Sequence, residues 1–307
     1  MQPEIRNIVI VLGPTGVGKS RAAVTLALRF GGEIINGDSI QVYRGFDIGT
    51  DKPTAAMRRG VPHHLIDAVD PGFQFTAADF IREALEAARE IAGRGRLPIV
   101  VGGTGLYLKA LVEGLFPGPG RNPALRAALE AEARQKGLEA LFRKLQEVDP
   151  SYARAIRSRD RIRIIRALEV YRTTGRPLSE HFRQTVPPAA GSNIVKIGLA
   201  LEREALYSRI EERVDRMFER GLAEEVRGLI AKGVAEDSPP FRALGYRHVL
   251  SLIRGEISED EARARTKRDT RRYAKRQTTW FRKMPGVAWF SPDDLSGLES
   301  YLQNHLQ

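Results

Sequence analysis

Eight consecutive residues near the N-terminus match the pattern G-x-x-x-x-G-K-[ST]. They are Gly13, Pro14, Thr15, Gly16, Val17, Gly18, Lys19 and Ser20. The glycines let backbone N–H groups turn toward an anion, the lysine adds a positive charge, and the serine hydroxyl can ligate Mg²⁺. An apolar run precedes the motif and a helical pattern follows it, which favours a phosphate loop over a chance glycine-rich turn. The pattern predicts a site for a diphosphate or a polyphosphate such as ATP, without deciding between them.

Two polar residues follow later apolar runs. Asp38 comes just after residues 33–36, and Thr104 follows residues 97–101 and two glycines. Ligands of open α/β sheets bind at the carboxyl ends of the strands, so we expect both residues beside the phosphate loop. Asp38 could be a metal partner or a general base; the alternative is a helix cap or turn former. For Thr104 the alternative is a simple N-cap. The run 97–101 lacks the terminal aspartate that holds the metal in many ATPases and GTPases.

These residues need a scaffold, and the first part of the chain alternates strand-like and helix-like segments. Residues 8–12, 33–36 and 97–101 read as buried strands, as do residues 194–201 farther along. Helices are expected at 21–30, ended by Gly31, and at 76–92, capped by Thr76 with Asp79 three residues on. This alternation predicts a parallel sheet covered on both faces, a P-loop NTPase-like α/β core.

A helical insertion interrupts this core. Proline and glycine clusters at 117–120 and 186–191 bracket a stretch that reads as helices only, with Asn122 and Asp160 as caps and Gly175 as a terminator. We therefore expect a core of residues 1–118 and 193–307 and an insertion domain of residues 119–192. The C-terminal remainder reads as helical. Its last long helix, from Ser258 to Met284, carries Tyr273, Gln277, Trp280, Phe281 and Met284 on a side expected to pack on the core.

Composition narrows the partners. The 307-residue chain has a net charge of +11, which favours nucleic acid as a partner, although a merely basic enzyme would have the same balance. It has no cysteine, so disulfides and thiolate metal sites are excluded. The sequence lacks the long apolar stretch that a signal peptide or a membrane span would need. We therefore expect a cytoplasmic monomer without membrane association.

Several further motifs resemble the tRNA dimethylallyltransferases, also called tRNA isopentenyltransferases. They are DSIQVYR at 38–44, DIGT at 47–50, PHHLID at 62–67, GGTGLY at 102–107, RALEV at 166–170, RVD at 213–215, GY at 245–246 and RQTTWFR at 276–282. The resemblance covers nearly the whole chain, about residues 5 to 290. One departure is Asp51, where the family usually has a small residue. The adjacent His63 and His64, without further ligands, fit a structural role better than a metal site.

The resemblance implies a transfer reaction that does not use ATP. The phosphate loop would hold dimethylallyl diphosphate with Mg²⁺, bound through Ser20. The exocyclic N6 amine of the adenosine 3′-adjacent to the anticodon would attack the allylic carbon, and diphosphate would leave. Asp38 is implied as the general base, Thr104 as a positioning group and Arg213 as the group that stabilises the departing charge. The acceptors would be tRNAs that read codons beginning with U.

The same resemblance implies contacts with the tRNA anticodon stem-loop. The residues concerned are Asp38, Ser39, Ile40, Gln41, Thr104, Arg126, Ile162, Arg163, Ile164, Ile165, Arg166, Arg242, Ala243, Leu244, Gly245, Tyr246, Arg247, Lys275, Arg276, Gln277, Thr278, Thr279, Trp280, Phe281 and Arg282. Arg157, Arg159, Arg161, Arg268 and Arg272 would add phosphate contacts, unless these runs are simply solvated helix surfaces.

Three other functions share parts of this pattern. A P-loop nucleotide or small-molecule kinase would turn over ATP, but it gives no reason for the insertion or for the basic C-terminal helix. A dimethylallyltransferase acting on free AMP or ADP would not need so basic a surface. A non-catalytic RNA-binding protein would leave the phosphate loop, Asp38 and Thr104 without a purpose.

Overall fold

The computed structural model describes residues 4–306, which form two compact units. One unit comprises the chain up to Val112 and from Ala189 onward, and the other comprises Glu113–Pro188. Each has its own apolar core. The second unit starts six residues before the insertion expected from sequence (113 against 119) and ends four residues earlier (188 against 192).

The first unit is built on a six-stranded sheet of order β3-β2-β4-β1-β5-β6 in which every pairing is parallel. The strands are β1 (Asn7–Leu12), β2 (Gly32–Asn36), β3 (His63–His64), β4 (Leu97–Gly102), β5 (Asn193–Leu199) and β6 (Val287–Phe290). The four strands expected from sequence are confirmed, although β5 ends at Leu199 rather than residue 201. The expectation that the remainder is helical was wrong for β6. That strand has four residues, too few to show a period, and they are only partly buried.

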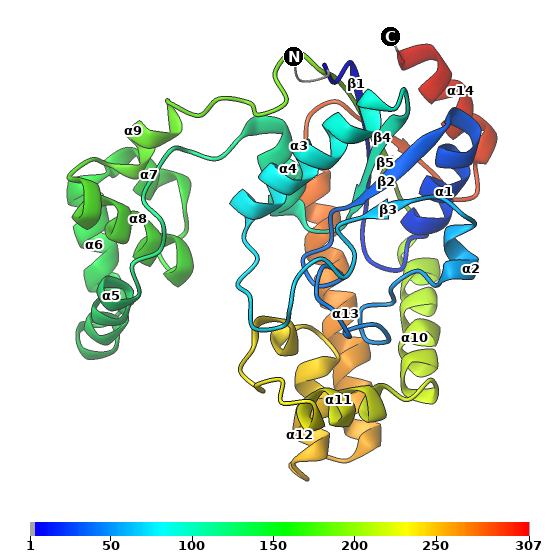
Figure 1. Ribbon diagram of the computed structural model, residues 1–307. Helices are drawn as coiled ribbons and strands as arrows, with labels where there is room; N and C mark the ends of the chain where they lie inside the picture. Colours follow the sequence, from blue (N-terminus) through cyan, green and yellow to red (C-terminus); the bar gives the residue numbers. More distant parts are fainter. Residues whose placement is uncertain (1–3, 307) are drawn as a thin grey trace. The chain divides into compact units, whose positions relative to one another are not determined.

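Helices cover both faces of the sheet, which is why its central strands are continuous apolar runs. Side chains of β1 alternate between two cores, with Ile8 and Ile10 in one and Val9 and Val11 in the other. The first core includes α3 (Ala77–Gly93) and α4 (Gly105–Glu113), and the second includes α1 (Lys19–Phe30) and α14 (Leu295–His305) (Figure 1). The P-loop-like α/β fold is thus confirmed.

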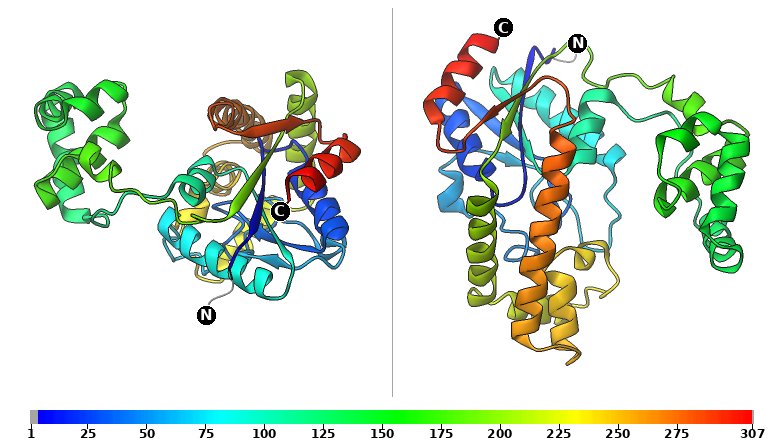
Figure 2. Two further views of the ribbon diagram at one scale, coloured as in Figure 1. Left: turned by 90° about the horizontal axis from the view of Figure 1, so that it is seen from above. Right: turned by 180° about the vertical axis from the view of Figure 1, so that it is seen from behind.

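Local capping explains several helix boundaries. Gly31 ends α1 with φ 63°, and Thr76 with Asp79 forms a reciprocal capping box at the start of α3, both as expected. The remaining helices of this unit are α2 (Ala55–Arg58), α10 (Arg203–Glu219), α11 (Leu222–Ala231), α12 (Tyr246–Ile253) and α13 (Glu259–Phe281), with a 3₁₀ turn at Pro239–Arg242. The helices α10 and α13 pack side by side below the sheet in Figure 1, and Figure 2 shows the same pair from behind.

The second unit is a small helical bundle. Its helices are α5 (Pro123–Lys136), α6 (Leu138–Val148), α7 (Pro150–Ala155), α8 (Arg161–Thr174) and α9 (Leu178–Phe182). The caps expected at Asn122 and Asp160 are present, and Gly175 ends α8 with φ 71°. Among residues 4–306, no helix is long and apolar enough to cross a membrane.

Candidate functional site

The phosphate loop leaves β1 after Leu12 and enters α1 at Lys19, which confirms the strand–loop–helix context of the motif. Gly16 and Gly18 have φ angles of 80° and 103°, which residues with side chains rarely adopt. A Cβ on Gly16 would lie 2.9 Å from Ile210 Cγ1, because α10 packs directly against the loop. The loop therefore presents backbone amides at the N-terminal end of a helix, the arrangement that favours anion binding.

Lys19 lies inside this loop. Its Nζ donates a 2.8 Å hydrogen bond to Pro14 O. Burial lowers the pKa of Lys19 to about 8; Arg213 acts in the same direction, and the Asp38 carboxylate partly opposes both. An anion bound in the loop would favour the charged ammonium, because it supplies the counter-charge that burial withholds.

Asp38 follows the carboxyl end of β2 and has two roles. Its Oδ1 accepts hydrogen bonds from Ile40 N (2.8 Å) and Gln41 N (3.3 Å), and its own N–H donates to Asn36 Oδ1 (3.1 Å). The residue is thus a turn former, as the alternative interpretation held. It also lines two adjoining cavities, so the turn holds its carboxylate at the site.

Thr104 follows β4 and contacts the Asp38 turn. Its Oγ1 accepts from Ser39 N (3.0 Å) and donates to Ser39 Oγ (3.3 Å), while its carbonyl accepts from Tyr107 N at the start of α4. The carbonyl is therefore a backbone cap, and the hydroxyl links β4 to the turn that carries Asp38. Ser39 lines the second cavity. Thr104 is not among the residues that line that cavity, but its hydroxyl holds Ser39 in place.

Arg213 reaches the phosphate loop from α10. Its Nη1 donates to Thr15 Oγ1 (2.5 Å) and its Nη2 to Thr50 O (3.5 Å). Its Nε lies 3.1 Å from Asp51 Oδ2, yet this buried nitrogen has no aligned hydrogen-bond partner. We take the contact as an ion pair, because charge attraction at that distance needs no hydrogen-bond alignment.

Two adjoining cavities meet beside Asp38 and Arg213. One has a volume of about 290 Å³ and is lined by the phosphate loop, and the other has a volume of about 350 Å³ and lies toward α12 and α13. The residues that line both are Thr15, Asp38, Thr50, Arg213 and Tyr273. Asp38 and Arg213, predicted from separate motifs, are thus brought together at the junction of the two cavities.

The cavities differ in chemistry. The first is lined by five cationic side chains and two carboxylates: Lys19, Arg21, Arg209, Arg213 and Arg216, with Asp38 and Asp51. The second has apolar walls that include Val214, Met217, Ala243 and Leu244, with Arg242 and Arg276 also lining it. The first suits a multiply charged anion, and the second suits a flat ring with an apolar face.

Gln277 on α13 connects the phosphate loop to the sheet. Its Nε2 donates to Gly103 O (2.7 Å), and its Oε1 accepts from Thr15 N (2.8 Å). Of the side of this helix expected to pack on the core, Gln277 and Phe281 are buried and Tyr273 is half-buried, but Trp280 remains 37% exposed. The expectation was therefore wrong for Trp280, whose indole lies over Gly105 instead.

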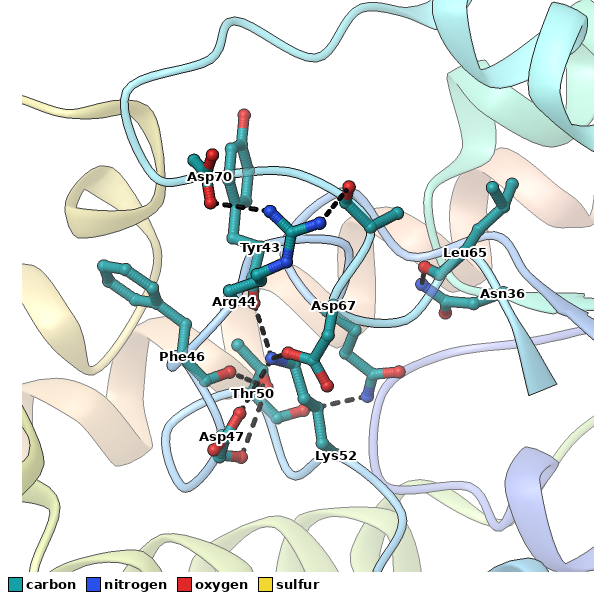
Figure 3. A network of polar contacts seen from close by, with 12 residues as sticks. Asn36, Tyr43, Arg44, Phe46, Asp47, Thr50, Lys52, Leu65, Asp67 and Asp70 are labelled. Carbon is teal, nitrogen blue, oxygen red and sulfur yellow. Dashed lines mark hydrogen bonds and ion pairs between the residues drawn. The ribbon is translucent and has the colours of Figure 1, made fainter.

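A buried ammonium holds the segment that carries Thr50. Lys52 Nζ donates to Tyr43 O (2.5 Å), Asp47 Oδ1 (2.8 Å) and Asp67 Oδ1 (2.5 Å), as Figure 3 shows. Nearby, Arg44 donates to Asp70 Oδ1 (2.6 Å). The turn at residues 47–52 is thus tied to two neighbouring segments, and this network was not predicted from the sequence.

Glu225 on α11 anchors the same turn from another side. Its carboxylate accepts from three successive backbone amides, those of residues 47–49, and from Tyr246 OH (2.6 Å). Tyr246 OH in turn accepts from Gly49 N (3.1 Å). Sequence reasoning missed Glu225, because these contacts link positions 176–178 residues apart and no local motif marks them.

The residues implied as tRNA contacts divide by burial. Ile164, Ile165, Tyr246, Gln277 and Phe281 are buried, so their side chains face the protein interior. The members with exposed side chains are Ile162, Arg163, Arg242, Arg247, Lys275, Arg276, Thr279, Trp280 and Arg282. The exposed side chains are available to a macromolecule. Of the half-buried ones, Asp38, Ser39, Ile40, Ala243 and Leu244 line the second cavity.

In the second unit, a buried carboxylate contacts two of the arginines that the resemblance implies as tRNA contacts. Glu169 is fully buried; it accepts from Asn122 N (2.7 Å) and Arg166 Nη1 (3.0 Å), and it lies 3.6 Å from Arg126 Nη1. Arg166 also donates to Pro119 O (2.7 Å). These contacts fix the start of the bundle, a structural role for Arg126 and Arg166 that the sequence did not indicate.

The donor set fits a metal that is bound mainly through a substrate. Within residues 4–306, no group of three or more His, Asp or Glu side chains could hold a metal ion. Ser20 lines the first cavity beside Lys19 and Asp38. Mg²⁺ at phosphate sites commonly takes one or two protein ligands and completes its shell with phosphate oxygens and water, which this arrangement allows.

The histidines predicted to be structural lie in β3. His63 Nδ1 contacts Val61 O (2.8 Å), and His64 Nε2 contacts the buried Glu33 carboxylate (2.7 Å). His63 also lines the first cavity.

Comparison with known proteins agrees with this geometry. The family model described as IPP transferase matches residues 41–284, and a model described as isopentenyl transferase matches residues 6–68. A tRNA dimethylallyltransferase of Geobacter sulfurreducens is 50% identical over 92% of this chain and 91% of its own length. One of Thermomicrobium roseum is 51% identical over 93% of this chain and 86% of its own length.

Solved structures show the same likeness. A tRNA isopentenylpyrophosphate transferase of Bacillus halodurans superposes with a TM-score of 0.73 at 42% identity, covering 98% of this chain and 97% of that one. A eukaryotic dimethylallyltransferase acting on tRNA gives a TM-score of 0.80 at 30% identity, covering 97% and 77%. The chain therefore belongs to the IPP transferase family, the family of the tRNA dimethylallyltransferases.

Proposed function

We propose that this transferase moves a dimethylallyl group from dimethylallyl diphosphate to the N6 amine of the adenosine 3′-adjacent to the anticodon, in tRNAs that read codons beginning with U. The observation that carries the proposal is the pair of cavities that share Asp38 and Arg213. The cationic cavity takes the diphosphate, and the apolar cavity takes the adenine. Relatives named tRNA dimethylallyltransferase support the choice of donor and acceptor.

The chemistry follows from this placement. An adenine amine is a poor nucleophile, because its lone pair is delocalised into the ring. As the bond from N6 to the allylic carbon forms, the bond from that carbon to the diphosphate oxygen breaks. Asp38 takes the proton from N6 as general base, and its turn keeps the carboxylate in position. The diphosphate leaves into a cradle formed by the loop amides, Lys19 and Arg213.

Thr104 acts as a positioning residue in this scheme, because its hydroxyl fixes Ser39 next to Asp38. Mg²⁺ would be held by Ser20 Oγ and diphosphate oxygens, where it neutralises the charge of the leaving group. The adenosine must leave its base stack to enter the cavity, so an extruded nucleotide is expected. Exposed cations around the second cavity, Arg242 and Arg276 among them, would contact the RNA backbone.

The proposal includes a monomer, since residues of a single chain line both cavities. It also includes a cytoplasmic location, where the tRNA acceptor is found. Size-exclusion chromatography with light scattering tests the first point, and cell fractionation tests the second.

The decisive experiment incubates the protein with Mg²⁺, dimethylallyl diphosphate and unmodified tRNA, followed by digestion and nucleoside analysis. N6-dimethylallyladenosine at the position 3′ to the anticodon is the expected product. Equal or faster transfer to free AMP would overturn the tRNA assignment. Phosphate release from ATP at comparable efficiency would favour a kinase or ATPase.

A further inference from the structure

The first cavity contains a carboxylate that the transfer reaction does not use. Asp51 lines it, and its Oδ2 lies 3.1 Å from Arg213 Nε. The side chain of Asp51 is 39% exposed and that of Arg213 is 18% exposed, so solvent screens the pair only in part. A negative charge therefore lies next to the Arg213 guanidinium, which is expected to face the departing diphosphate.

The other contacts of Arg213 would let a bound anion replace Asp51 beside the guanidinium. Its Nη1 and Nη2 donate to Thr15 Oγ1 and Thr50 O, so the side chain is held in place without Asp51. The Nε contact lacks hydrogen-bond alignment. Asp51 is thus an alternative anion for a guanidinium that the loop already orients, rather than the group that orients it.

The backbone holds this carboxylate at the site. Asp51 has a φ of 56°, a left-handed conformation that is costly for most residues but tolerated by Asp and Asn. The turn is fixed by Lys52 on one side and by Glu225 on the other. These contacts hold the backbone of Asp51 beside the cavity, so its carboxylate stays within reach of Arg213.

We propose that Asp51 is an internal counter-ion for Arg213 that competes with bound diphosphate and so promotes its release; the inference rests on the proposed function. Breaking the carbon–oxygen bond leaves inorganic diphosphate with one more ionisable oxygen than the donor had. Arg21 and Arg209 pair with Asp293, and Arg216 lies 3.8 Å from Glu212. Lys19 and Arg213 would therefore hold the more highly charged product more strongly than the donor, unless a carboxylate beside them offset part of their charge. Asp51 supplies this negative charge beside Arg213.

The test measures binding of magnesium diphosphate by calorimetry to the wild-type chain and to Asp51→Asn. Asn is nearly isosteric and tolerates the same backbone conformation. We expect the variant to bind inorganic diphosphate more tightly by roughly fivefold, the upper range for one partly exposed charge pair. The difference should shrink as KCl is raised, because salt screens the Asp51 charge. Asp70→Asn is the matched control: it loses the same charge next to Arg44, outside both cavities, and should bind as the wild type does.

Kinetics give a second readout. The inhibition constant for diphosphate should fall more in Asp51→Asn than the KM for the donor does. Single-turnover transfer should be at least as fast as in the wild type, because Arg213 stays held by Thr15 and Thr50. Weaker diphosphate binding in the variant would overturn the proposal and make Asp51 a metal ligand or a positioning residue for Arg213. Unchanged binding would also overturn it, while leaving the transferase assignment intact. If neither protein binds diphosphate, the assignment of the first cavity fails, and this inference fails with it.

Discussion

Arg213 Nη1 donates a 2.5 Å hydrogen bond to Thr15 Oγ1, which joins α10 to the phosphate loop across 198 positions of sequence. The side chain and the loop that are expected to face the leaving diphosphate are therefore in direct contact. Donors that are oriented in advance stabilise developing charge without paying for reorganisation during the reaction. The same contact sets one wall of both cavities, since Thr15 and Arg213 line each of them.

Asp38→Asn should separate catalysis from architecture. The amide oxygen can still accept from Ile40 N and Gln41 N, so the turn should persist, but the general base is lost. We expect transfer to fall by about 10²–10⁴-fold, the usual contribution of general base catalysis. Single-turnover rates and tRNA binding should be measured on the same preparation, and tRNA affinity should be largely retained.

Asp38→Ala is the companion variant, because it removes the turn acceptor as well as the base. It should lose thermal stability relative to Asp38→Asn, with a similar loss of transfer. If Asp38→Asn kept the wild-type rate, the general-base assignment would be abandoned.

Lys19 predicts a pH dependence of diphosphate binding. Burial lowers its pKa to about 8, so above pH 8 the free protein carries mostly neutral Lys19. A bound anion raises that pKa again, so binding takes up a proton, and affinity falls as pH rises through 8. Calorimetry at pH 9 in two buffers of different ionisation enthalpy measures the uptake, and the share due to Lys19 should be close to zero at pH 6.5.

The diphosphate ligand also titrates in this range, so Lys19→Met serves as the reference. Any uptake left in that variant belongs to the ligand, and the excess in the wild-type protein belongs to Lys19. Equal proton uptake by both proteins would contradict the assignment.

Much of the sheet could be predicted, because its signals are local. The glycine-rich motif, the apolar runs of β1 and β4 and the caps at Thr76 and Asn122 each depend on a few adjacent residues. The short strands β3 and β6 could not be predicted: they owe their existence to neighbouring strands rather than to a pattern of their own.

In the candidate site, too, the features with local signals could be predicted, and those that depend on distant partners could not. The position of Asp38 after a strand predicted that it lies at the carboxyl end of the sheet and left open whether it is a base or a turn former. The folded chain shows that one oxygen is engaged by its own turn. Lys52 and Glu225 carry no motif, and their roles depend on partners that only the folded chain brings near. Trp280 is a case in which a sequence pattern misled. Its helical spacing predicted burial, but the indole lies over Gly105 and is partly exposed.

Gln277→Leu should loosen the phosphate loop. Leucine is similar in size but leaves Thr15 N and Gly103 O without their partner, which costs about 1–3 kcal/mol for buried groups. We expect a lower midpoint of urea unfolding and a higher KM for the donor. Gln277→Glu keeps an acceptor for Thr15 N but adds a negative charge to the diphosphate cavity, so its KM for the donor should rise at least as far as that of the leucine variant. Full donor affinity in Gln277→Leu would show that the loop keeps its shape without this bridge.

Removing Arg272 and Arg276 together should weaken tRNA binding and reduce its salt dependence. Arg272 is exposed on α13, and Arg276 lines the second cavity with its guanidinium over the Tyr273 ring. If each contacts one phosphate, the slope of log affinity against log salt should become shallower by about 1.5. Filter binding across KCl concentrations measures this slope. The control is Arg29→Ala with Arg82→Ala, which loses the same charge from exposed positions on α1 and α3, outside both cavities. An equal change of slope in the control would mean that net charge, rather than this face of α13, governs the interaction with RNA.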